Sequence, residues 1–462
     1  MKYTISILFL ICLVQINFFI QRHEFATLFA TYAVFFAAYL FVLKKATSSK
    51  DLSFFIIIGL ILRGIAVFSF PNLSDDIYRF LWDGHLINLG ENPFSHTPQY
   101  YVDNQLFSER LTPELFSKLN SSNYYSVYPS VCQSVFTLAT FLFPKSLYGA
   151  AVVIKLFLFL CEAGTIFLMK KMTANTSLFR INAPLIYALN PLIIIELVGN
   201  AHFEAAMIFF FILAIFLLKT TERVISNHPL SNVQSLFLSA TAFSLSVVSK
   251  MLPLMFLPLF YKKSGWKRSF SIWIMVGILT LIFCLPIYNA LFFNNIGKSL
   301  GLYFGNFEFN ASIFYVFRAV GFGVYGYNMI HQISPVLTLF VVLFILKKSF
   351  FDNNKIHTSP QEIGVEAQNN SLLFNDCLLI VSVYFACATT VHPWYAALPL
   401  ACSVFTKWQF PIVWTCLIFL TYAGYTEGSS KHTENMPYLI IEYSVVYAFF
   451  AFEWFQKKQS KA

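Results

Sequence analysis

Charged residues are scarce in this chain. Asp, Glu, Lys and Arg supply 11% of its 462 residues, whereas 57% are hydrophobic. This composition excludes an ordinary water-soluble domain, in which about a quarter of the residues are charged. The formal charge of +9 does not indicate a nucleic-acid partner, because basic residues in a membrane protein usually report its orientation. Lipid is therefore the expected solvent for most of the chain.

Other absences exclude further classes. The eight cysteines form no C-x-x-C pair, so neither a disulfide framework nor a zinc site is indicated. The chain also lacks a tight metal-ligand spacing such as H-E-x-x-H, and we predict no metal and no cofactor. No internal repeat is visible, which weakens an interpretation as a secondary transporter. The first apolar run lacks a small-residue cleavage pattern, so we expect a retained span.

Apolar runs of about 17–25 residues recur between short charged stretches, as helices that cross a hydrocarbon core of about 30 Å require. The runs are too long and too unalternating for the strands of a membrane barrel. We therefore predict an all-α, polytopic transmembrane helix bundle with about 13–14 spans, in which residues 1–462 form one integral-membrane domain. Candidate spans cover residues 4–20, 25–43, 53–70, 147–169, 182–199, 203–218, 234–249, 251–261, 269–290, 334–346, 372–390, 393–406, 410–424 and 438–455.

Basic residues are unevenly distributed between alternate loops. If the N-terminus is cytoplasmic, most of the 31 Lys and Arg residues fall in cytoplasmic segments. The positive-inside rule therefore favours cytoplasmic N- and C-termini. This orientation places two long segments, 71–146 and 291–333, on the extracytoplasmic face, and it makes the hydrophilic stretch 349–371 a cytoplasmic linker.

Two adjacent carboxylates lie at the start of the segment 71–146. Ser74, Asp75 and Asp76 precede a plausible amphipathic helix, and one interpretation is a helix N-cap with an acidic first turn. The other interpretation is catalytic. A carboxylate at a lipid–water boundary has a pKa that is sensitive to burial and to its neighbour, which suits a general base or a charge stabiliser.

The rest of this segment is also rich in candidate site residues. Arg79 and Asp83 are spaced i, i+4 and can pair on one helical face. Trp82 lies on a neighbouring face that suits the membrane interface. Tyr128 lies near the start of the apolar stretch 127–143, which we interpret as a helix that lies along or dips into the outer surface.

These residues resemble a known family signature. The run S-D-D-I-Y-R-F-L-W-D-G at 74–84, G-E-N-P-F at 90–94 and Y-P-S at 128–130 resemble the first-loop signature of bacterial GT-C glycosyltransferases. The resemblance is strongest to polyprenol-phosphate-mannose-dependent mannosyltransferases, which are similar to the eukaryotic GPI mannosyltransferase I. The family's usual Tyr, Tyr and second Pro are replaced here by Phe80, Phe94 and Ser130.

The resemblance continues along most of the chain. It includes an N-P-x-x-x-x-E element followed by G-x-H-x-D, a K-x-x-P element, an f-N-x-S element and a late H-P-W-Y element. In this sequence the elements contribute Glu196, His202, Glu204, Lys250, Asn310, His392, Trp394 and Tyr395. Glu204 stands where the family more often has Asp. With the predicted topology, nearly all of these elements and the acidic pair lie at outer span ends or in outer loops, as a single site requires.

The resemblance implies a reaction. An acceptor hydroxyl attacks the anomeric carbon of a β-linked polyprenyl-phosphate sugar, and inversion gives an α-linkage. Asp75 or Asp76 would be the base, and the family pattern slightly favours Asp75. Lys250, with Arg318 as second choice, would bind the phosphate on which negative charge accumulates; the structural alternative for Lys250 is a snorkelling cation.

The other assigned residues have structural alternatives as well. His202 and Glu204 would look the same if they only capped a helix turn, and the H-P-W-Y element could anchor the chain in an aromatic belt. Glu196 lies inside a span, where a carboxylate is costly unless it is paired. The predicted substrate-binding residues are Arg79, Trp82, Asp83, Tyr128, Glu196, His202, Glu204, Lys250, Asn310, Arg318, His392, Trp394 and Tyr395.

The predicted protein is an inverting glycosyltransferase in a bacterial inner membrane. Its partners would be a polyprenyl-phosphate hexose, mannose by resemblance, a lipid or glycan acceptor, and membrane lipids, with no nucleic acid. A carrier or flippase for lipid-linked sugars is the main alternative. An O-antigen polymerase or ligase normally has its large loop late in the chain, whereas this one comes early.

Overall fold

The computed structural model describes residues 1–174, 176, 178–224, 229–305, 307–352, 363–427 and 432–459. Within these residues the chain is helical and contains no β-strand, apart from an isolated parallel bridge between Phe309 and Thr390. The predicted all-α fold is confirmed.

Among the described residues, seven helical segments are long and apolar enough to cross a membrane. An eighth candidate is a pair of helices, Pro191–Gly199 and Glu204–Leu218, bent by 109° at a short break. The chain is thus a multi-pass membrane protein, as predicted. The seven segments are Lys2–Phe19, Phe25–Lys45, Leu147–Thr173, Gly265–Ile287, Ile330–Phe351, Ala367–Cys387 and Met436–Gln459.

These segments belong to the longest helices of the bundle. Their elements are α1 (Lys2–Val14) with η1 (Gln15–Phe19), α2 (Phe25–Lys45), α8 (Leu147–Thr173), α13 (Phe260–Cys284) with η4 (Leu285–Ile287), α16 (Ile330–Leu346) with η5 (Lys347–Phe351), α17 (Ile363–Cys387) and α20 (Met436–Gln459). Of the predicted linker 349–371, the first residues therefore belong to η5 and the last to α17, whereas 353–362 lie outside the described residues.

Other helices fill the bundle or form its connections. The predicted count of about 13–14 spans includes several of these shorter elements. In the bundle they are α3 (Ser49–Val67), α9 (Leu185–Ala188), α10 (Pro191–Ile193), η2 (Ile194–Gly199), α11 (Glu204–Val224), α12 (Pro229–Val247), η3 (Leu252–Leu259), η6 (Pro393–Ala396), α18 (Ala397–Ser403), α19 (Phe410–Leu417) and η7 (Ile418–Gly424). The two long connections contain α4 (Asp76–Asn88), α5 (Pro98–Asp103), α6 (Pro113–Ser117), α7 (Ser130–Leu142), α14 (Phe292–Gly305) and α15 (Ile313–Tyr325).

The break between η2 and α11 has a local cause. Ala201 adopts a left-handed backbone conformation with φ 62°, which a helix cannot continue through. Gly199 packs so closely on Asn17 that an added Cβ would lie 2.6 Å from the Asn17 amide nitrogen. A side chain at residue 199 would displace the Asn17 side chain, and the bend carries His202 and Glu204 into the interior of the protein, where both are buried.

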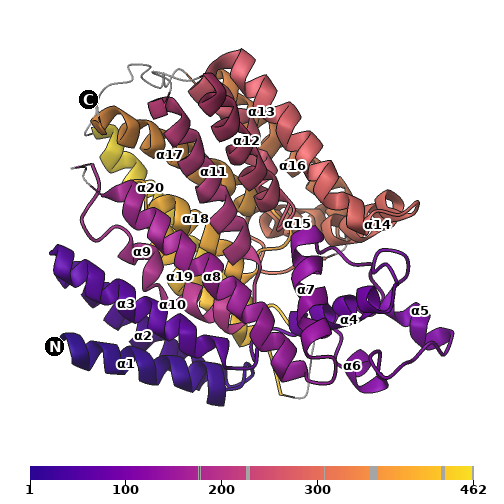
Figure 1. The fold of residues 1–462 in the computed structure, drawn as a ribbon. Helices are drawn as coiled ribbons and strands as arrows, with labels where there is room; N and C mark the ends of the chain where they lie inside the picture. The colour runs from indigo at the N-terminus through magenta and orange to yellow at the C-terminus, as the bar shows by residue number, and fades with distance from the viewer. Residues whose placement is uncertain are drawn as a thin grey trace.

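The two ends of the bundle differ. The N- and C-termini lie at one end, whereas α4 to α6 and α14 lie at the opposite end (Figure 1). The two long connections predicted to share one face of the membrane therefore lie at the same end of the bundle.

Asparagine side chains join these two connections. Asn92 donates to the Ile287 carbonyl at 2.8 Å, and Asn295 donates to the Phe94 carbonyl at 2.9 Å. Asn289 donates to the Ser95 hydroxyl at 2.9 Å. We call Asn92, Asn289 and Asn295 the asparagine seam. Because it satisfies backbone groups as well as side chains, it fixes α14 against the loop that follows α4.

A buried ion pair ties three helices together inside the bundle. Arg63 on α3 and Glu162 on α8 are both fully buried and lie 2.9 Å apart. Arg63 also donates to the carbonyl of Ala188 at 2.6 Å, and Tyr187 donates its hydroxyl to Glu162 at 2.5 Å. Such a pair is compatible with a low-dielectric interior because every charge is also hydrogen-bonded.

Candidate functional site

The acidic motif forms the start of α4. Asp75 is the N-cap residue, Asp76 is the first helical residue, and the Ser74 hydroxyl accepts a hydrogen bond from the Asp76 backbone N–H at 3.3 Å. The cap interpretation therefore holds for the backbone, although the side chain of Asp75 makes no capping bond. Both carboxylates are left to interact with other parts of the chain.

The two carboxylates have different surroundings. Asp75 pairs with Arg22 at 2.7 Å. Asp76 instead accepts a hydrogen bond from the Asn120 amide at 3.2 Å. Burial raises the pKa of Asp76 above its ordinary value, and the charge of Lys250 partly offsets this rise. Asp76 is thus a carboxylate whose pKa is moved toward neutrality, as a general base requires.

Lys250 links the motif to the bent pair of helices. It lies directly after α12, and its ammonium pairs with the Glu204 carboxylate at 2.7 Å. Glu204 is the first residue of α11 and is buried, whereas the Lys250 side chain is 27% exposed. The ammonium also lies 5.5 Å from the centre of the Tyr395 ring, within cation–π range. Residues from separate parts of the chain therefore meet at one cation.

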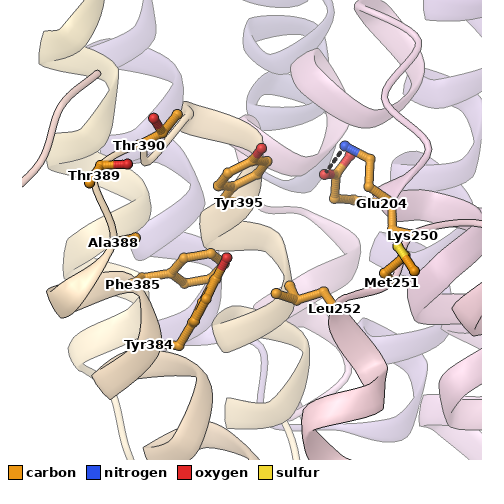
Figure 2. Close-up of a pocket in the computed structure, with 10 residues that line it drawn as sticks. All are labelled: Glu204, Lys250, Met251, Leu252, Tyr384, Phe385, Ala388, Thr389, Thr390 and Tyr395. Carbon is orange, nitrogen blue, oxygen red and sulfur yellow. Dashed lines mark ion pairs between the residues drawn. The ribbon is translucent and has the colours of Figure 1, made fainter. Parts of the chain in front are cut away.

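A pocket opens beside this ion pair. Figure 2 shows the Glu204–Lys250 pair on one side of the pocket and Thr389 and Thr390 on the other, with Tyr395 between them. The remaining walls are mostly apolar, so the pocket combines one charged side with a hydrophobic lining. The lining residues are Glu204, Lys250, Met251, Leu252, Tyr384, Phe385, Ala388, Thr389, Thr390 and Tyr395.

Five rings form a continuous column next to the pocket. Successive centroid distances are 3.6 Å from His202 to Trp394, 4.5 Å to His392, 4.4 Å to Phe309 and 4.3 Å to His432. We call these residues the aromatic column. Burial, with smaller contributions from the charges of Lys250 and His432, lowers the pKa of His392 to about 3. His392 is therefore neutral at physiological pH.

Glu196 is held inside the bundle. Its carboxylate is fully buried, accepts a hydrogen bond from the Tyr422 hydroxyl at 2.5 Å and lies 3.4 Å from the His202 ring. A carboxylate in this place is expected to be paired or functional. The contact joins Glu196 to the aromatic column rather than to the pocket itself.

Asn310 and Arg318 contact glutamates other than Glu204. The Asn310 backbone N–H donates to Glu434 at 2.6 Å, and its side chain donates to Glu442 at 3.2 Å. Arg318 pairs with Glu308 and lies 4.0 Å from the Tyr315 ring. The structure thus brings Lys250, and not Arg318, to the acidic motif and to Glu204.

The remaining predicted residues of the first connection form a buried network. Arg79 and Asp83 pair at 2.7 Å, which confirms the predicted i, i+4 contact, and Asp83 also accepts from the Ser126 hydroxyl at 2.5 Å. Trp82 is fully buried. Tyr128 packs on Phe80 and lies close to Asp76, whose pKa it lowers. These contacts hold the chain around residue 126 against α4.

The sequence did not indicate four residues that lie around the acidic motif and the aromatic column. Arg22 pairs with Asp75, Asn120 donates to Asp76, Phe309 packs on His392, and His432 packs on Phe309. Arg22 had a usable signal, because Gln21-Arg22-His23-Glu24 is a polar island between two apolar runs. The other three lack such a signal. In the described part of the chain, no group of three or more His, Cys, Asp or Glu is arranged to hold a metal ion.

The structure is thus an all-α membrane bundle that brings a carboxylate, a lysine and an amphiphilic pocket together. Residues 16–263, more than half of the chain, match the family described as "Alpha-(1->6)-mannopyranosyltransferase, N-terminal domain". The chain belongs to this family and is a mannosyltransferase, which confirms the predicted class of enzyme. No curated protein and no solved structure matches the chain.

The family match ends before part of the site. It includes the acidic motif, Glu204 and Lys250, whereas Asn310 and His392 lie beyond residue 263. The C-terminal part of the chain therefore contributes contacts that the matched segment does not contain.

Proposed function

We propose that this protein is an inverting mannosyltransferase that takes mannose from a polyprenyl-phosphate donor. The acceptor is a hydroxyl of a lipid or glycan on the extracytoplasmic face of the membrane. The family's description names α-(1→6) transfer, and inversion at a β-linked donor gives an α-linkage.

The observation that carries this proposal is the meeting of separate segments at Lys250. A cation that is 27% exposed and paired with Glu204 at the edge of a largely apolar pocket suits a phosphate attached to a long hydrocarbon chain. The phosphate gains negative charge as the C1–O bond breaks. A positive group placed there stabilises the transition state more than the ground state.

Asp76 is the carboxylate that best suits the base. It takes the proton of the acceptor hydroxyl while that oxygen attacks C1, and the electron pair of the broken bond leaves with the phosphate. The raised pKa of Asp76 supports this role. The family pattern slightly favours Asp75, but the carboxylate of Asp75 is already engaged in a direct ion pair with Arg22.

The other predicted residues receive supporting roles. His392 and Trp394 of the aromatic column pack on Tyr395, which lines the pocket, and we assign the column to support of this wall of the pocket. Tyr128 lowers the pKa of Asp76, and we assign it to the surroundings of this carboxylate. Arg79, Trp82 and Asp83 are buried, and we assign them to positioning of α4 rather than to direct contact with substrate.

The distribution of lysines supports the proposed orientation. α2, α8 and α20 each carry two lysines in the last turn, and α20 ends at the C-terminus, at the end of the bundle where the N-terminus also lies (Figure 1). The positive-inside rule assigns that end to the cytoplasm. The acidic motif then faces the extracytoplasmic side of a bacterial inner membrane.

The buried charges do not favour a carrier. A pathway for a lipid-linked sugar needs polar groups that face a water-filled passage. Instead, Arg63 is bonded to Glu162, and Lys155 donates to the carbonyl and hydroxyl of Ser69 at 2.5 and 2.8 Å. All three charged side chains are fully buried.

Transfer of radiolabelled mannose tests the proposal directly. Purified protein receives polyprenyl-phosphate mannose and an alkyl α-mannoside as a simple acceptor. Asp76→Asn should lower transfer about 10²–10⁴-fold, the range expected for loss of a general base. Asp103→Asn is the matched control, because Asp103 is exposed in the same connection. Wild-type protein that transfers nothing would reject the donor, and full activity in Asp76→Asn would reject the base.

A further inference from the structure

Arg22 lies in the short turn between η1 and α2, far from the acidic motif in the sequence. Two hydrogen bonds between its first and last residues, Gln21 and Glu24, close the turn. The Gln21 backbone N–H donates to the Glu24 carboxylate at 2.7 Å, and the Glu24 N–H donates to the Gln21 carbonyl at 3.0 Å. These two bonds fix the backbone on both sides of Arg22.

The segment that leads into α4 is bound to the same turn twice. The Asn72 amide donates to the carbonyls of Ile16 and Ile20, both at 2.8 Å. Three residues later, Asp75 pairs with Arg22 at 2.7 Å. The first contact sets where the segment lies, and the second adds a charged contact at the residue that begins the helix.

The guanidinium of Arg22 is placed between two partners. It lies 4.7 Å from the centre of the Tyr425 ring, which comes from the connection between η7 and α20. Its other partner is the Asp75 carboxylate, and the two charged side chains are only 18% and 28% exposed. A planar guanidinium suits both contacts at once, because it stacks on a ring and donates in its own plane.

We propose that Arg22 is a positioning residue for the acidic motif: it neutralises Asp75 and fixes the start of α4, leaving Asp76 as the carboxylate that faces Lys250. The inference rests on the proposed function, because it takes Asp76 to be the general base.

Neutralisation matters because adjacent carboxylates oppose each other's ionisation. The negative charge of Asp75 raises the pKa of Asp76, and a permanent positive charge beside Asp75 limits this effect. Without Arg22, a larger share of Asp76 would carry a proton at neutral pH and could not act as base. The charged and titratable groups that interact with one or both carboxylates are Arg22, Tyr78, Tyr128, Glu204, Lys250 and Tyr425.

The test is the pH dependence of kcat in the mannose-transfer assay. Arg22→Gln should move the acidic limb upward by on the order of one pH unit, because Asp75 loses its counter-charge. Arg22→Lys keeps the charge and should leave the limb close to that of the wild type. The double variant Arg22→Gln/Asp75→Asn should return the acidic limb to the wild-type pH, because the uncompensated charge is then absent. A lower kcat with an unmoved limb in Arg22→Gln would reduce Arg22 to a structural contact and overturn the proposal.

A second measurement does not depend on turnover. Thermal unfolding of Arg22→Gln, Asp75→Asn and the double variant forms a double-mutant cycle. Coupling between the two sites is expected, whereas strictly additive losses would overturn the ion pair itself. Failure of the proposed function gives a different result: wild-type protein without transfer, or an active Asp76→Asn variant, with the cycle still coupled.

Discussion

The buried pair of Arg63 and Glu162 allows a quantitative test of the fold. Both side chains are fully buried, with 0% of their surface accessible to solvent. Replacing Glu162 with Gln keeps its shape but leaves the Arg63 charge without a counter-charge. Loss of one partner of a buried ion pair costs about 3–5 kcal/mol. Replacing both partners with apolar residues removes the uncompensated charge and is often nearly neutral.

The contacts of Arg63 set where in this range the loss should fall. Its guanidinium keeps hydrogen bonds to the carbonyls of Gly59 at 3.1 Å and Ala188 at 2.6 Å in the Glu162→Gln variant. These bonds retain part of the stabilisation, so we expect a loss near the lower limit, about 3 kcal/mol. Arg63→Met should cost more, because it leaves Glu162 without its counter-charge and also removes the donor to the Ala188 carbonyl.

The cysteines provide the assay. All eight are free, and Cys161 is buried directly beside Glu162. A thiol-reactive fluorophore therefore reports their exposure as the protein unfolds in detergent. We expect the midpoint of Glu162→Gln to fall by about 3 °C. The double variant Arg63→Met/Glu162→Leu should recover most of this loss.

An exposed ion pair is the matched control. Glu114 and Lys118 are spaced i, i+4 at 3.5 Å, and the Glu114 side chain is 78% exposed. Glu114→Gln should change stability by less than about 0.5 kcal/mol. A wild-type midpoint in Glu162→Gln, or a double variant less stable than both single variants, would refute the reasoning.

Three further predictions follow from the site and its surroundings. Lys250→Met should raise KM for the donor at least about 10-fold through loss of a charged phosphate contact, and it should move the acidic limb of kcat upward, because Lys250 lowers the pKa of Asp76. Burial lowers the pKa of His392 to about 3, so the unfolded chain binds one more proton than the folded chain below about pH 6.5, and the free energy of unfolding falls as the pH drops toward 3. In the thiol-exposure assay, His392→Gln should make this fall with pH less steep. Asn295→Ala should cost about 1 kcal/mol and speed proteolysis near Phe94, because it removes one bond of the asparagine seam.

Local patterns in the sequence predicted the fold and part of the site. Long apolar runs require helices in lipid whatever their neighbours are, and the i, i+4 spacing of Arg79 and Asp83 was sufficient to predict their pair. The helix start at Asp75 and Asp76 is likewise a local property. In each case the signal and the structure lie within a few residues of each other.

Contacts between distant segments were not predictable in the same way. Nothing near Asp75 indicates that Arg22 is its partner, and nothing near His392 indicates Phe309 or His432. These contacts depend on how the helices pack, which hydrophobic periodicity does not specify. The same reason explains why Arg318 was a reasonable phosphate ligand from the sequence, although it lies beside Glu308.

The asparagine seam also sets an order of assembly. Its bond from Asn295 to Phe94 joins residues separated by 201 positions. At a synthesis rate of about 5–20 residues per second, roughly 10–40 s pass between the appearance of these two residues. A nascent chain therefore carries the loop that follows α4 long before α14 exists, so this loop completes its contacts only after the second connection has been made.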